Sequence, residues 1–280
     1  MTTQLPENEL LSIPYAAYAA APGINKSGLD QVLRSPAHYR AYLAGKTEEV
    51  SPDLEQGRIT HACVLEPDEY ARLAVIKPKL TRKNEEAWLA ELLAARPDAM
   101  VVSEKQHELA MSQRDAVWAN RDAATLLSKG QREASLFWQD PNYGVRCKAR
   151  LDFVSRVGSK GICVDLKTTR DATRSAFSRS MVSYAYDMQA SHYMEGGQRT
   201  GLYDGENFFF IVVEKKPPYA TVVYSLSPWA KTRGFKWREE AMSIYAQACR
   251  SNQWPSLAST DELTLPKWAK VPGEEEEYAE

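Results

Sequence analysis

An apolar segment near the middle of this 280-residue chain, residues 161–169, ends in the pattern Asp-x-Lys. Thirteen residues before Asp165 of this pattern, Asp152 lies in another strand-like segment, between apolar neighbours. Because successive side chains of a strand point to opposite faces, Asp165 and Lys167 share one face of the predicted strand. Two carboxylates can bind a divalent metal ion, and a lysine can orient or deprotonate an attacking water molecule. The pattern predicts metal-dependent hydrolysis of a phosphodiester; the structural alternative is a surface ion pair between Asp165 and Lys167.

The order of predicted elements after residue 130 favours a mixed α/β (α+β) fold. Apolar runs separated by turn residues predict strands at 133–138, 145–154, 162–167, 207–214 and 219–226. Helices are predicted at about 171–179 and 181–198, and from 228 to about 250. The first three strands can form an antiparallel meander, and the helical excursion predicts a right-handed crossover to a parallel neighbour. We therefore expect a mixed β-sheet flanked by helices.

The first half of the chain has a different, helical pattern. After an irregular start, apolar periodicity and helix-start residues predict helices that begin near residue 24 and cover 36–43, 54–65, 84–95 and 103–128. The last residues are rich in Glu and Pro. We therefore divide the chain into a helical N-terminal region (1–130), a mixed core (131–250) and a loose acidic tail (251–280).

Composition places the chain among soluble globular proteins, with 44% hydrophobic and 26% charged residues. The four cysteines are scattered and form no CxxC pair, which argues against a zinc or iron–sulfur site and against a disulfide framework. There is no apolar run of membrane-spanning length and no signal-like N-terminus, so we expect a cytoplasmic protein without membrane contact.

The distribution of charge is more informative than the net charge of −2. Five glutamates lie within residues 271–280, whereas residues 144–190 carry nine Lys or Arg against four Asp. Positive charge is thus concentrated around the Asp-x-Lys strand, where a phosphate backbone would lie. A solvated basic face is the alternative explanation of the same count.

Other candidate residues lie on predicted helices. Gln189 and Tyr193 are four residues apart, so one helix face can present an amide and a phenol toward the metal site. His61 is a candidate imidazole ligand, and Gly57, one turn earlier, favours a close approach at the same face. An ordinary amphipathic helix and a structural histidine are the simpler explanations of these patterns.

Several ordered blocks resemble one known family. They comprise residues 25–30 with 35–39, residues 57–67, residues 133–169, and the pattern Gln189-x-x-x-Tyr193. Together they cover about residues 24–195, and the chain resembles the RecE-type exonucleases (exonuclease VIII) of the PD-(D/E)xK nuclease superfamily. The resemblance implies the restriction-endonuclease-like core of that superfamily. Asp-x-Lys alone is weakly specific, whereas the ordered set is specific.

The resemblance also implies residue roles. Asp152 and Asp165 would hold a shared metal ion, with the backbone carbonyl of Leu166 as a further ligand. His61 would complete a second metal site, so two Mg²⁺ ions are implied, with Mn²⁺ as a substitute. Lys167 would position the attacking water.

The remaining candidates surround these positions. Gln189 and Tyr193 would steady the metal assembly, and Glu133 is a secondary candidate because its strand enters the same sheet. Three further residues could contact the 5′-phosphate end of DNA, since hydroxyl and guanidinium groups suit phosphate. These residues are Ser27, Arg34 and Ser35. The two serines could instead serve as helix caps.

The activity implied by the resemblance is processive 5′→3′ digestion of one strand of linear double-stranded DNA. Such digestion releases mononucleotides and leaves a 3′ single-stranded overhang, on which a RecT-type single-strand annealing protein would load. A homo-oligomeric ring around the DNA is also implied. These features would place the protein in DNA recombination and repair, in the manner of phage recombination enzymes.

Two other functions are compatible with the same residues. The first is a structure-specific DNA endonuclease of the same superfamily, which the metal site alone does not distinguish from an exonuclease. The second is a non-catalytic DNA-binding protein with an inactive nuclease fold. The acidic tail could be a solubilising end, a mimic of DNA charge, or a docking segment for a basic partner.

Overall fold

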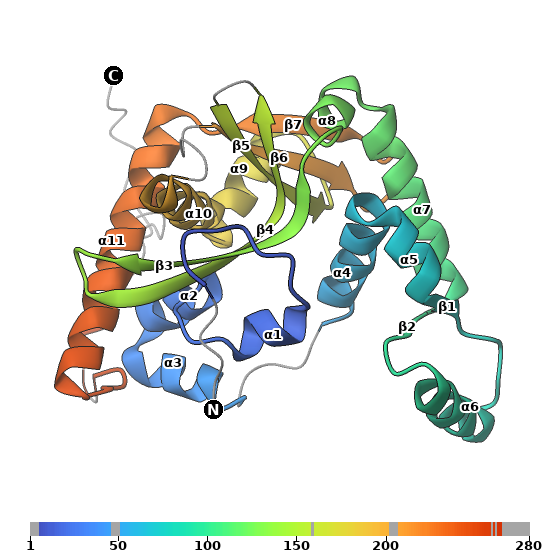
Figure 1. The fold of residues 1–280 in the computed structure, drawn as a ribbon, viewed down its shortest axis with the longest axis horizontal. Coiled ribbons are helices and arrows are strands. Elements are labelled where there is room, and N and C mark those ends of the chain that lie inside the picture. The colour runs from blue at the N-terminus through green and yellow to red at the C-terminus, as the bar shows by residue number, and fades with distance from the viewer. Residues whose placement is uncertain are drawn as a thin grey trace, which may run out of the picture.

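A five-stranded mixed sheet forms the centre of the molecule in the computed structural model, which describes residues 6–45, 51–157, 160–201, 207–258, 260 and 262–264. The strands are β3 (Gln131–Asp140), β4 (Val145–Val157), β5 (Lys160–Thr169), β6 (Asn207–Glu214) and β7 (Thr221–Ser225), and they lie in this order across the sheet. The neighbours β3, β4 and β5 are antiparallel, β5 and β6 are parallel, and β6 and β7 are antiparallel. The predicted meander and crossover are therefore confirmed, and the chain has a mixed α/β fold (Figure 1).

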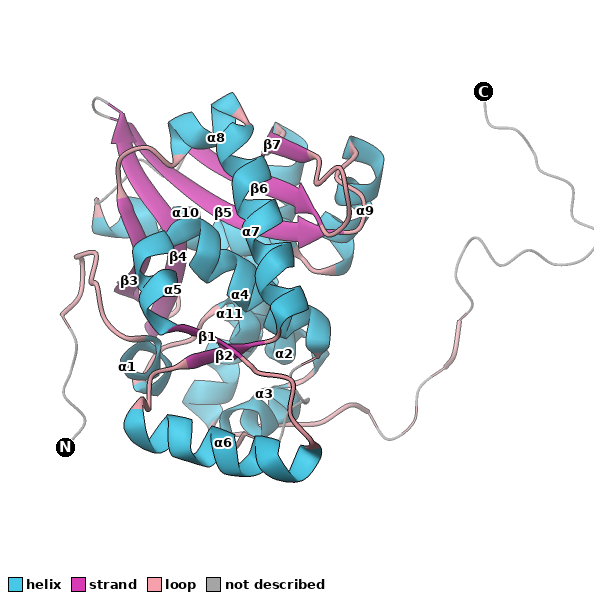
Figure 2. Cartoon of the chain, turned by 90° about the vertical axis from the view of Figure 1, so that its right-hand side faces the viewer, coloured by secondary structure: helices cyan, strands magenta, loops and turns pink. Residues whose placement is uncertain are grey.

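Helices cover both faces of this sheet. On one face, α10 (Tyr186–Thr200) and α11 (Pro228–Ser251) pack with α2 (Lys26–Arg34) and α3 (Pro36–Leu43) around a buried apolar cluster that includes Trp138, Leu151 and Met188. On the other face, α4 (Pro52–Leu65), α7 (Glu104–Ala119) and α8 (Arg121–Leu126) cover Phe153 and Leu166. Figures 1 and 2 show this sandwich, with the sheet between the two helical layers.

Side-chain caps fix where several of these helices begin. The Asn25 side chain accepts a hydrogen bond from the Gly28 backbone at the start of α2, and Ser35 does the same for α3, which opens with proline. Ser103 and Gln106 form a reciprocal capping box at the start of α7. The helix starts expected from Ser-Pro and Ser-Glu patterns are thus present. Ser27, by contrast, lies inside α2 rather than at its cap.

A smaller unit projects from the sandwich. It contains α5 (Pro67–Leu73), the parallel pair β1 (Ala74–Ile76) and β2 (Met100–Val102), and α6 (Arg82–Ala95) between them. A third apolar cluster, which includes Cys63, Tyr70 and Val102, joins this unit to α4 and α7. None of the residues of α6 is buried, and Figure 2 shows this helix at the edge of the molecule.

The structure corrects several predicted boundaries. The helix expected over 103–128 is divided at Asn120, whose extended backbone ends α7 and whose side chain caps α8. The helices expected at 171–179 and 181–198 are α9 (Arg174–Ser183) and α10, which are separated at Ala185 by a left-handed backbone conformation with φ of 49°. The short strands β1 and β2 were not predicted, because three residues carry too little periodicity.

The N-terminal segment runs along the sheet before α2 begins. A short helix, α1 (Tyr15–Ala20), lies between two isolated bridges that pair Leu11 with Ser135 and Ile24 with Cys147. The division of the chain at residues 130 and 250 stays a prediction. The acidic residues 271–280 lie outside the described residues. Of the described helices, none has both the length and the apolar composition needed to cross a bilayer.

Candidate metal centre

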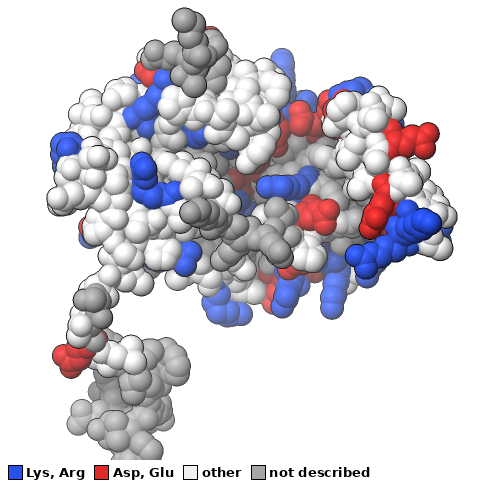
Figure 3. Space-filling model, turned by 90° about the horizontal axis from the view of Figure 1, so that it is seen from below, with Lys and Arg blue, Asp and Glu red and all other residues white. Residues whose placement is uncertain are grey.

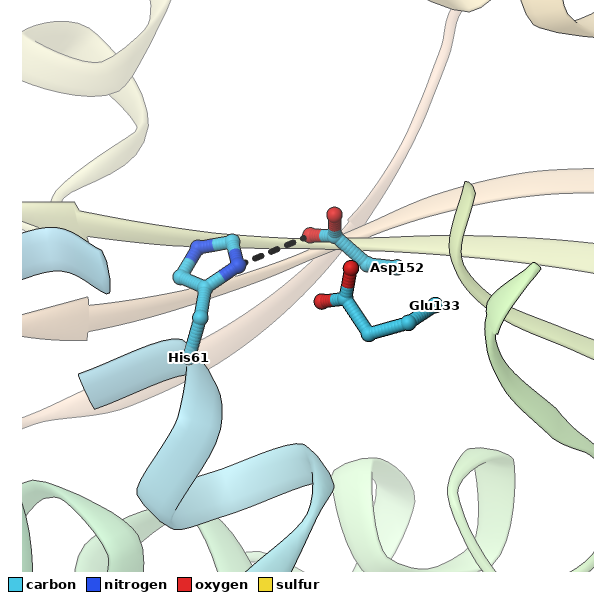
Figure 4. Close-up of side chains that lie close together, drawn as sticks. All are labelled: His61, Glu133 and Asp152. Carbon is cyan, nitrogen blue, oxygen red and sulfur yellow. Dashed lines mark ion pairs between the residues drawn. The ribbon is translucent and has the colours of Figure 1, made fainter. Parts of the chain in front are cut away.

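One imidazole and two carboxylates meet at the edge of the sheet. His61 comes from α4, Glu133 from β3 and Asp152 from β4, and one ligand atom of each lies within 4.8 Å of the other two (Figure 4). The distance from His61 Nδ1 to Asp152 Oδ2 is 3.4 Å. Glu133, a secondary candidate from the sequence, lies beside His61 and Asp152 in the structure.

A local irregularity of the strands brings these carboxylates together. The register on either side, Arg132 with Phe153 and Ala134 with Leu151, sets Glu133 opposite Asp152. Glu133 has a φ of 48°, in the left-handed region that non-glycine residues seldom occupy. Leu151 faces the first apolar cluster and Phe153 the second, so the normal alternation of β4 is interrupted at Asp152. Strain of this kind is concentrated at functional sites in folded proteins.

The second feature is a fork between β4 and β5. Their ladder ends at the pair Phe153 and Val164, so Asp152 and Asp165 occupy the next positions, where the strands separate. The backbone N–H of Leu166 donates to Asp152 Oδ2 at 2.8 Å. The carboxylate thus takes the place of a ladder partner and satisfies a backbone group that the fork leaves open.

Asp165 is held from two sides on β5. Lys167 Nζ lies 2.6 Å from Asp165 Oδ2, and Gln189 Nε2 of α10 donates to Asp165 Oδ1 at 2.5 Å. Lys167 Nζ also donates to Gln189 Oε1 at 3.2 Å. The structure therefore brings Asp165, Lys167 and Gln189 into one hydrogen-bonded group, as the sequence pattern indicated, and the Asp165 side chain is buried rather than part of a surface ion pair.

Two tyrosines of α10 complete the surroundings of the lysine. The Lys167 ammonium lies 4.5 Å from the ring centroid of Tyr186, a cation–π contact that sequence analysis missed. Tyr193, which was predicted, forms a side-chain hydrogen bond with Gln189, and burial raises its pKa well above the usual value. Tyr193 thus acts on the site through Gln189, whereas Tyr186 contacts the lysine itself.

Burial and neighbouring negative charge raise the pKa of both carboxylates of the cluster. Burial, and then the nearby charge of Asp165, raises the pKa of Asp152 to about 8. Burial and the charge of Asp152 raise the pKa of Glu133, and burial followed by the charge of Lys167 lowers the pKa of His61. A neutral imidazole and crowded carboxylates are a favourable setting for a divalent cation, which would supply the missing positive charge.

Both polar backbone groups of Leu166 interact with the cluster: its N–H with Asp152 and its carbonyl with His61. A hydrogen bond with this backbone raises the pKa of His61. The backbone group must therefore be an acceptor, because only an acceptor stabilises the protonated ring. The carbonyl of Leu166 therefore points toward His61. This is the group that the family resemblance implied as a further metal ligand.

The available donors fit a hard cation such as Mg²⁺ or Mn²⁺. Two carboxylates, one carbonyl and one imidazole supply oxygen and nitrogen ligands. Burial raises the pKa of Cys163 well above its usual value, so this residue stays a thiol and offers no thiolate ligand. Asp165 Oδ2 is buried, with the Lys167 ammonium 2.6 Å away. A carboxylate oxygen has two lone pairs, so Asp165 Oδ2 can accept a cation at the fork as well as the ammonium.

Two basic residues of β4, Arg150 and Lys148, contact the N-terminal segment, and Arg150 also binds the cluster. Arg150 Nε binds Glu133 Oε2 at 2.7 Å, and Arg150 Nη1 donates to the carbonyl of Ile13 at 2.9 Å. Lys148 donates to the carbonyls of Tyr18, Ala19 and Ala21 at the end of α1, and burial lowers its pKa to about 8. These contacts tie the N-terminal segment to the sheet, and a single Lys or Arg in a strand pattern gave no signal of them.

The residues predicted for a 5′-phosphate lie elsewhere. Ser27 and Arg34 are exposed on α2, and Arg34 donates to Gln31 at 3.2 Å. Ser35 is buried, and its hydroxyl lies 2.6 Å from His38 Nδ1. Across the described ranges, none of these three residues forms a hydrogen bond or ion pair with the cluster. Figure 3 shows a hollowed face on which acidic and basic side chains lie close together.

The fold and this site define the class of the protein. A mixed sheet whose central strand carries Asp-x-Lys, beside further carboxylates and a histidine, is a PD-(D/E)xK-type nuclease core. The family described as "PDDEXK-like domain of unknown function (DUF3799)" matches residues 26–263, and the chain belongs to this family. The superfamily expected from the sequence is thus confirmed, whereas a RecE-type specificity stays a prediction.

Comparison with solved structures gives the same fold. The chain is similar to a protein from Eubacterium rectale named "Putative exonuclease", with a TM-score of 0.57 and 13% identity, over 92% of this chain and 96% of that one. At this identity the likeness shows the fold alone. A structure named SSO0001 matches at 13% identity over 83% of this chain and 87% of that one, but its TM-score of 0.29 carries no argument. No curated protein matches the sequence.

Proposed function

We propose that this protein is a metal-dependent exodeoxyribonuclease that digests linear double-stranded DNA from 5′ ends and leaves 3′ overhangs. The observation that carries the proposal is the juxtaposition, at the fork of β4 and β5, of the His61–Glu133–Asp152 cluster with the Asp165–Lys167 pair. Carboxylates beside a held ammonium are suited to phosphodiester hydrolysis. The direction of digestion rests on the resemblance to RecE-type exonucleases.

The metal would be held by Asp152, Glu133 and His61, with Asp165 and the Leu166 carbonyl at the fork. When bound, a divalent cation supplies Lewis-acid polarisation of the phosphate and lowers the pKa of a coordinated water. Asp152, with its pKa of about 8, would have to lose its proton to serve as a ligand, so metal affinity should rise with pH up to that value.

Lys167 has a role that its charge helps to define. Burial alone would lower its pKa, but the carboxylates of Asp165 and Asp152 outweigh this effect, and the pKa is raised. The side chain is therefore an ammonium at neutral pH, which can donate hydrogen bonds but cannot accept a proton. This favours orientation of the water or phosphate over deprotonation of the water. Gln189 and Tyr186 keep the ammonium in place.

The predicted substrate and partner contacts remain part of the proposal. Exposed Arg34 and Ser27 are available for a 5′-phosphate, while Ser35 fits its observed role as the cap of α3. A RecT-type annealing protein and a homo-oligomeric ring follow from the resemblance. Light scattering of the purified chain tests the ring, and a pull-down with an annealing protein, with and without residues 271–280, tests that partner.

The test of activity uses linear duplex DNA labelled separately at each 5′ and 3′ end, with Mg²⁺ or with a chelator. We expect Mg²⁺-dependent release of mononucleotides from the 5′ label and no cleavage of closed circular DNA. Cleavage of closed circles would favour the endonuclease alternative.

Two substitutions test the catalytic assignment. Lys167→Ala and Asp165→Ala should lower digestion by at least ~100-fold, since they remove groups at the reacting centre. DNA binding should survive, and Lys105→Ala, on an exposed position of α7, should digest like the parent. If Lys167→Ala and Asp165→Ala digest linear DNA as fast as the parent, the assignment is wrong; a parent that binds DNA without digesting it would favour the non-catalytic alternative.

A further inference from the structure

We propose that a groove on α11 binds single-stranded nucleic acid by base stacking. The α11 groove has a volume of about 580 Å³ and is formed by Trp229, Thr232, Arg233, Lys236, Trp237 and Glu240. It lies outside the metal cluster, and none of the site residues described above belongs to it. Its chemistry combines two indoles, the cationic Lys236, and Arg233, which is partly engaged by Asp187, with one carboxylate, Glu240. Indoles beside cationic side chains suit a ligand that offers flat bases and phosphates.

The exposure of the two indoles is the first observation. Trp229 is 70% exposed and Trp237 is 44% exposed, although tryptophan is usually covered in folded proteins. Their spacing of eight residues places them on the same side of the helix, about 12 Å apart along its axis. The opposite side of α11 is buried through Gly234, Arg238 and Ala241. The two indoles are therefore presented to a ligand and take no part in the core.

The charge around the groove is the second observation, and it selects the kind of ligand. The groove is lined by Arg233 and Lys236 against the single carboxylate of Glu240, and the preceding residues of α11, 228–237, contain three Lys or Arg and no Asp or Glu. Within the described part of the chain, Lys236 forms no ion pair. A polyanion with aromatic bases complements this surface better than a neutral or acidic-rimmed protein face.

The groove is also connected to the candidate active site. Arg233 forms an ion pair with buried Asp187 of α10, two residues before Gln189. Next to α10, exposed Tyr184 stacks on Tyr186 with 5.5 Å between ring centroids, and Tyr186 in turn contacts Lys167. Tyr184 and Tyr186 thus lie between the start of α10, which contacts α11, and Lys167.

The state of the bound strand follows from the chemistry of stacking. Bases in a duplex already stack on one another, so exposed indoles gain little from double-stranded DNA. A single strand offers free base faces. Resting on the proposed nuclease function, we assign the groove to the strand that becomes unpaired as the duplex is consumed.

Binding is tested without catalysis, using a fluorescently labelled oligo(dT) and anisotropy in a chelator-containing buffer. Trp229→Ala and Trp237→Ala should each weaken the affinity by roughly 10-fold, because stacking on an aromatic side chain contributes that order of effect per base. Trp229→Phe and Trp237→Phe, which retain a ring, should restore most of the affinity. Trp118→Ala, which removes another partly exposed indole on α7, is the matched control and should bind like the parent.

A second variant tests the electrostatic part independently. Lys236→Ala should reduce the dependence of log affinity on log salt by about 0.7, the contribution of one phosphate contact on a single strand. Lys105→Ala should leave this slope unchanged.

Three outcomes would overturn the inference. The first is no binding of oligo(dT) by the parent, and the second is parental affinity in the Trp229→Ala/Trp237→Ala double variant. The third is a double variant that differs from the parent only in oligomeric state, which would identify a second copy of the chain as the occupant of the groove. Digestion with Mg²⁺ is measured separately. If the parent digests no DNA but binds oligo(dT) through these indoles, the groove stands and the proposed function fails. If it digests DNA while the indoles prove irrelevant, only the groove fails.

Discussion

Asp152 and Asp165 occupy adjacent positions across the fork of β4 and β5, yet their surroundings differ. Asp165 has a cation and an amide as partners, at 2.6 Å and 2.5 Å. Asp152 has the Leu166 N–H and the weakly basic imidazole of His61, so burial and the charge of Asp165 raise its pKa to about 8. Two carboxylates in contrasting environments are a common basis for dividing roles in an active site. Here Asp152 is the group that most needs an added cation.

The raised pKa of Asp152 predicts how stability depends on pH when metal is absent. Its folded-state pKa lies above the value of about 4 expected in the unfolded chain. The unfolded chain therefore ionises first, and the stabilising effect of the protonated side chain, complete below pH ~4, is lost as pH rises toward 8. Asp152→Asn should remove this loss. In chelator at pH 8, we expect the Tm of Asp152→Asn to exceed that of the parent by a few degrees. This follows because each kcal/mol of stability shifts the Tm of a protein of this size by ~2–4 °C.

The same comparison at pH 5 provides the control, because only a small part of the stabilising effect is then lost and the Tm difference should be much smaller than at pH 8. A Tm difference that is constant from pH 5 to pH 8 would contradict the raised pKa. Added Mg²⁺ should stabilise the parent more than Asp152→Asn.

At the residue scale, the structure brings together predicted residues whose chemistry and spacing coincide, while their roles stay predictions. Asp165, Lys167 and Gln189 were placed on facing elements, and the structure joins them. Glu133 was only a secondary candidate, because its approach to Asp152 depends on a φ of 48°, which a strand pattern does not encode. Tyr186 was missed because an aromatic residue at the start of a helix is an ordinary core residue until its neighbour is known to be a lysine.

At the scale of elements, the contact of α10 with α11 decides where Gln189 and the α11 groove lie. Gly234 is the point of closest approach, since a Cβ atom there would lie 2.1 Å from the carbonyl oxygen of Asp187. Gly234→Ala must therefore push the helices apart. We expect a loss of ~1–3 kcal/mol in unfolding free energy, measured by urea denaturation.

Gly57→Ala on α4 is the matched control. A Cβ atom at Gly57 would meet only Thr168 Oγ1, at 3.9 Å, which is ordinary contact. Because alanine favours helices more than glycine does, this change should stabilise the protein by up to ~1 kcal/mol. If both substitutions had the same sign, the close approach of α10 and α11 would not be the controlling factor.

Element order was predictable because strand and helix periods differ, and the order of the sheet follows from the handedness of the crossover. Element boundaries were less accessible. The division between α7 and α8 depends on one side-chain cap at Asn120, and the shift of α9 and α10 depends on the left-handed residue Ala185. Neither has a hydrophobic signal.

At the scale of the whole molecule, stability should be concentrated in the sandwich and not in the projecting unit. Helix α6 has no buried residue, although Leu89 and Leu93 lie on it. We expect Leu89→Ser/Leu93→Ser to change the unfolding free energy by less than ~0.5 kcal/mol per site. Leu136→Ala, at a fully buried position of β3, should cost ~2–5 kcal/mol in the same denaturation experiment.

A large loss in the double serine variant would show that α6 contributes to the core. If the purified protein is an oligomer, the comparison is made at several protein concentrations, since an interface on α6 would make the effect depend on concentration. The faces on which the helices pack could not be predicted, because each amphipathic pattern shows that a face is covered without showing by which element.

Direct binding of Mn²⁺, a paramagnetic substitute for Mg²⁺, tests the claim on which the account depends. Titration at pH 8, followed by the loss of free Mn²⁺ signal in electron paramagnetic resonance, should show saturable binding by the parent. Asp152→Asn and Glu133→Gln should each weaken that binding by at least ~10-fold, since each removes a carboxylate ligand. Glu104→Gln, on the exposed start of α7, should bind like the parent. Absence of saturable binding, or equal affinity in the parent and Asp152→Asn, would contradict a metal centre at His61, Glu133 and Asp152.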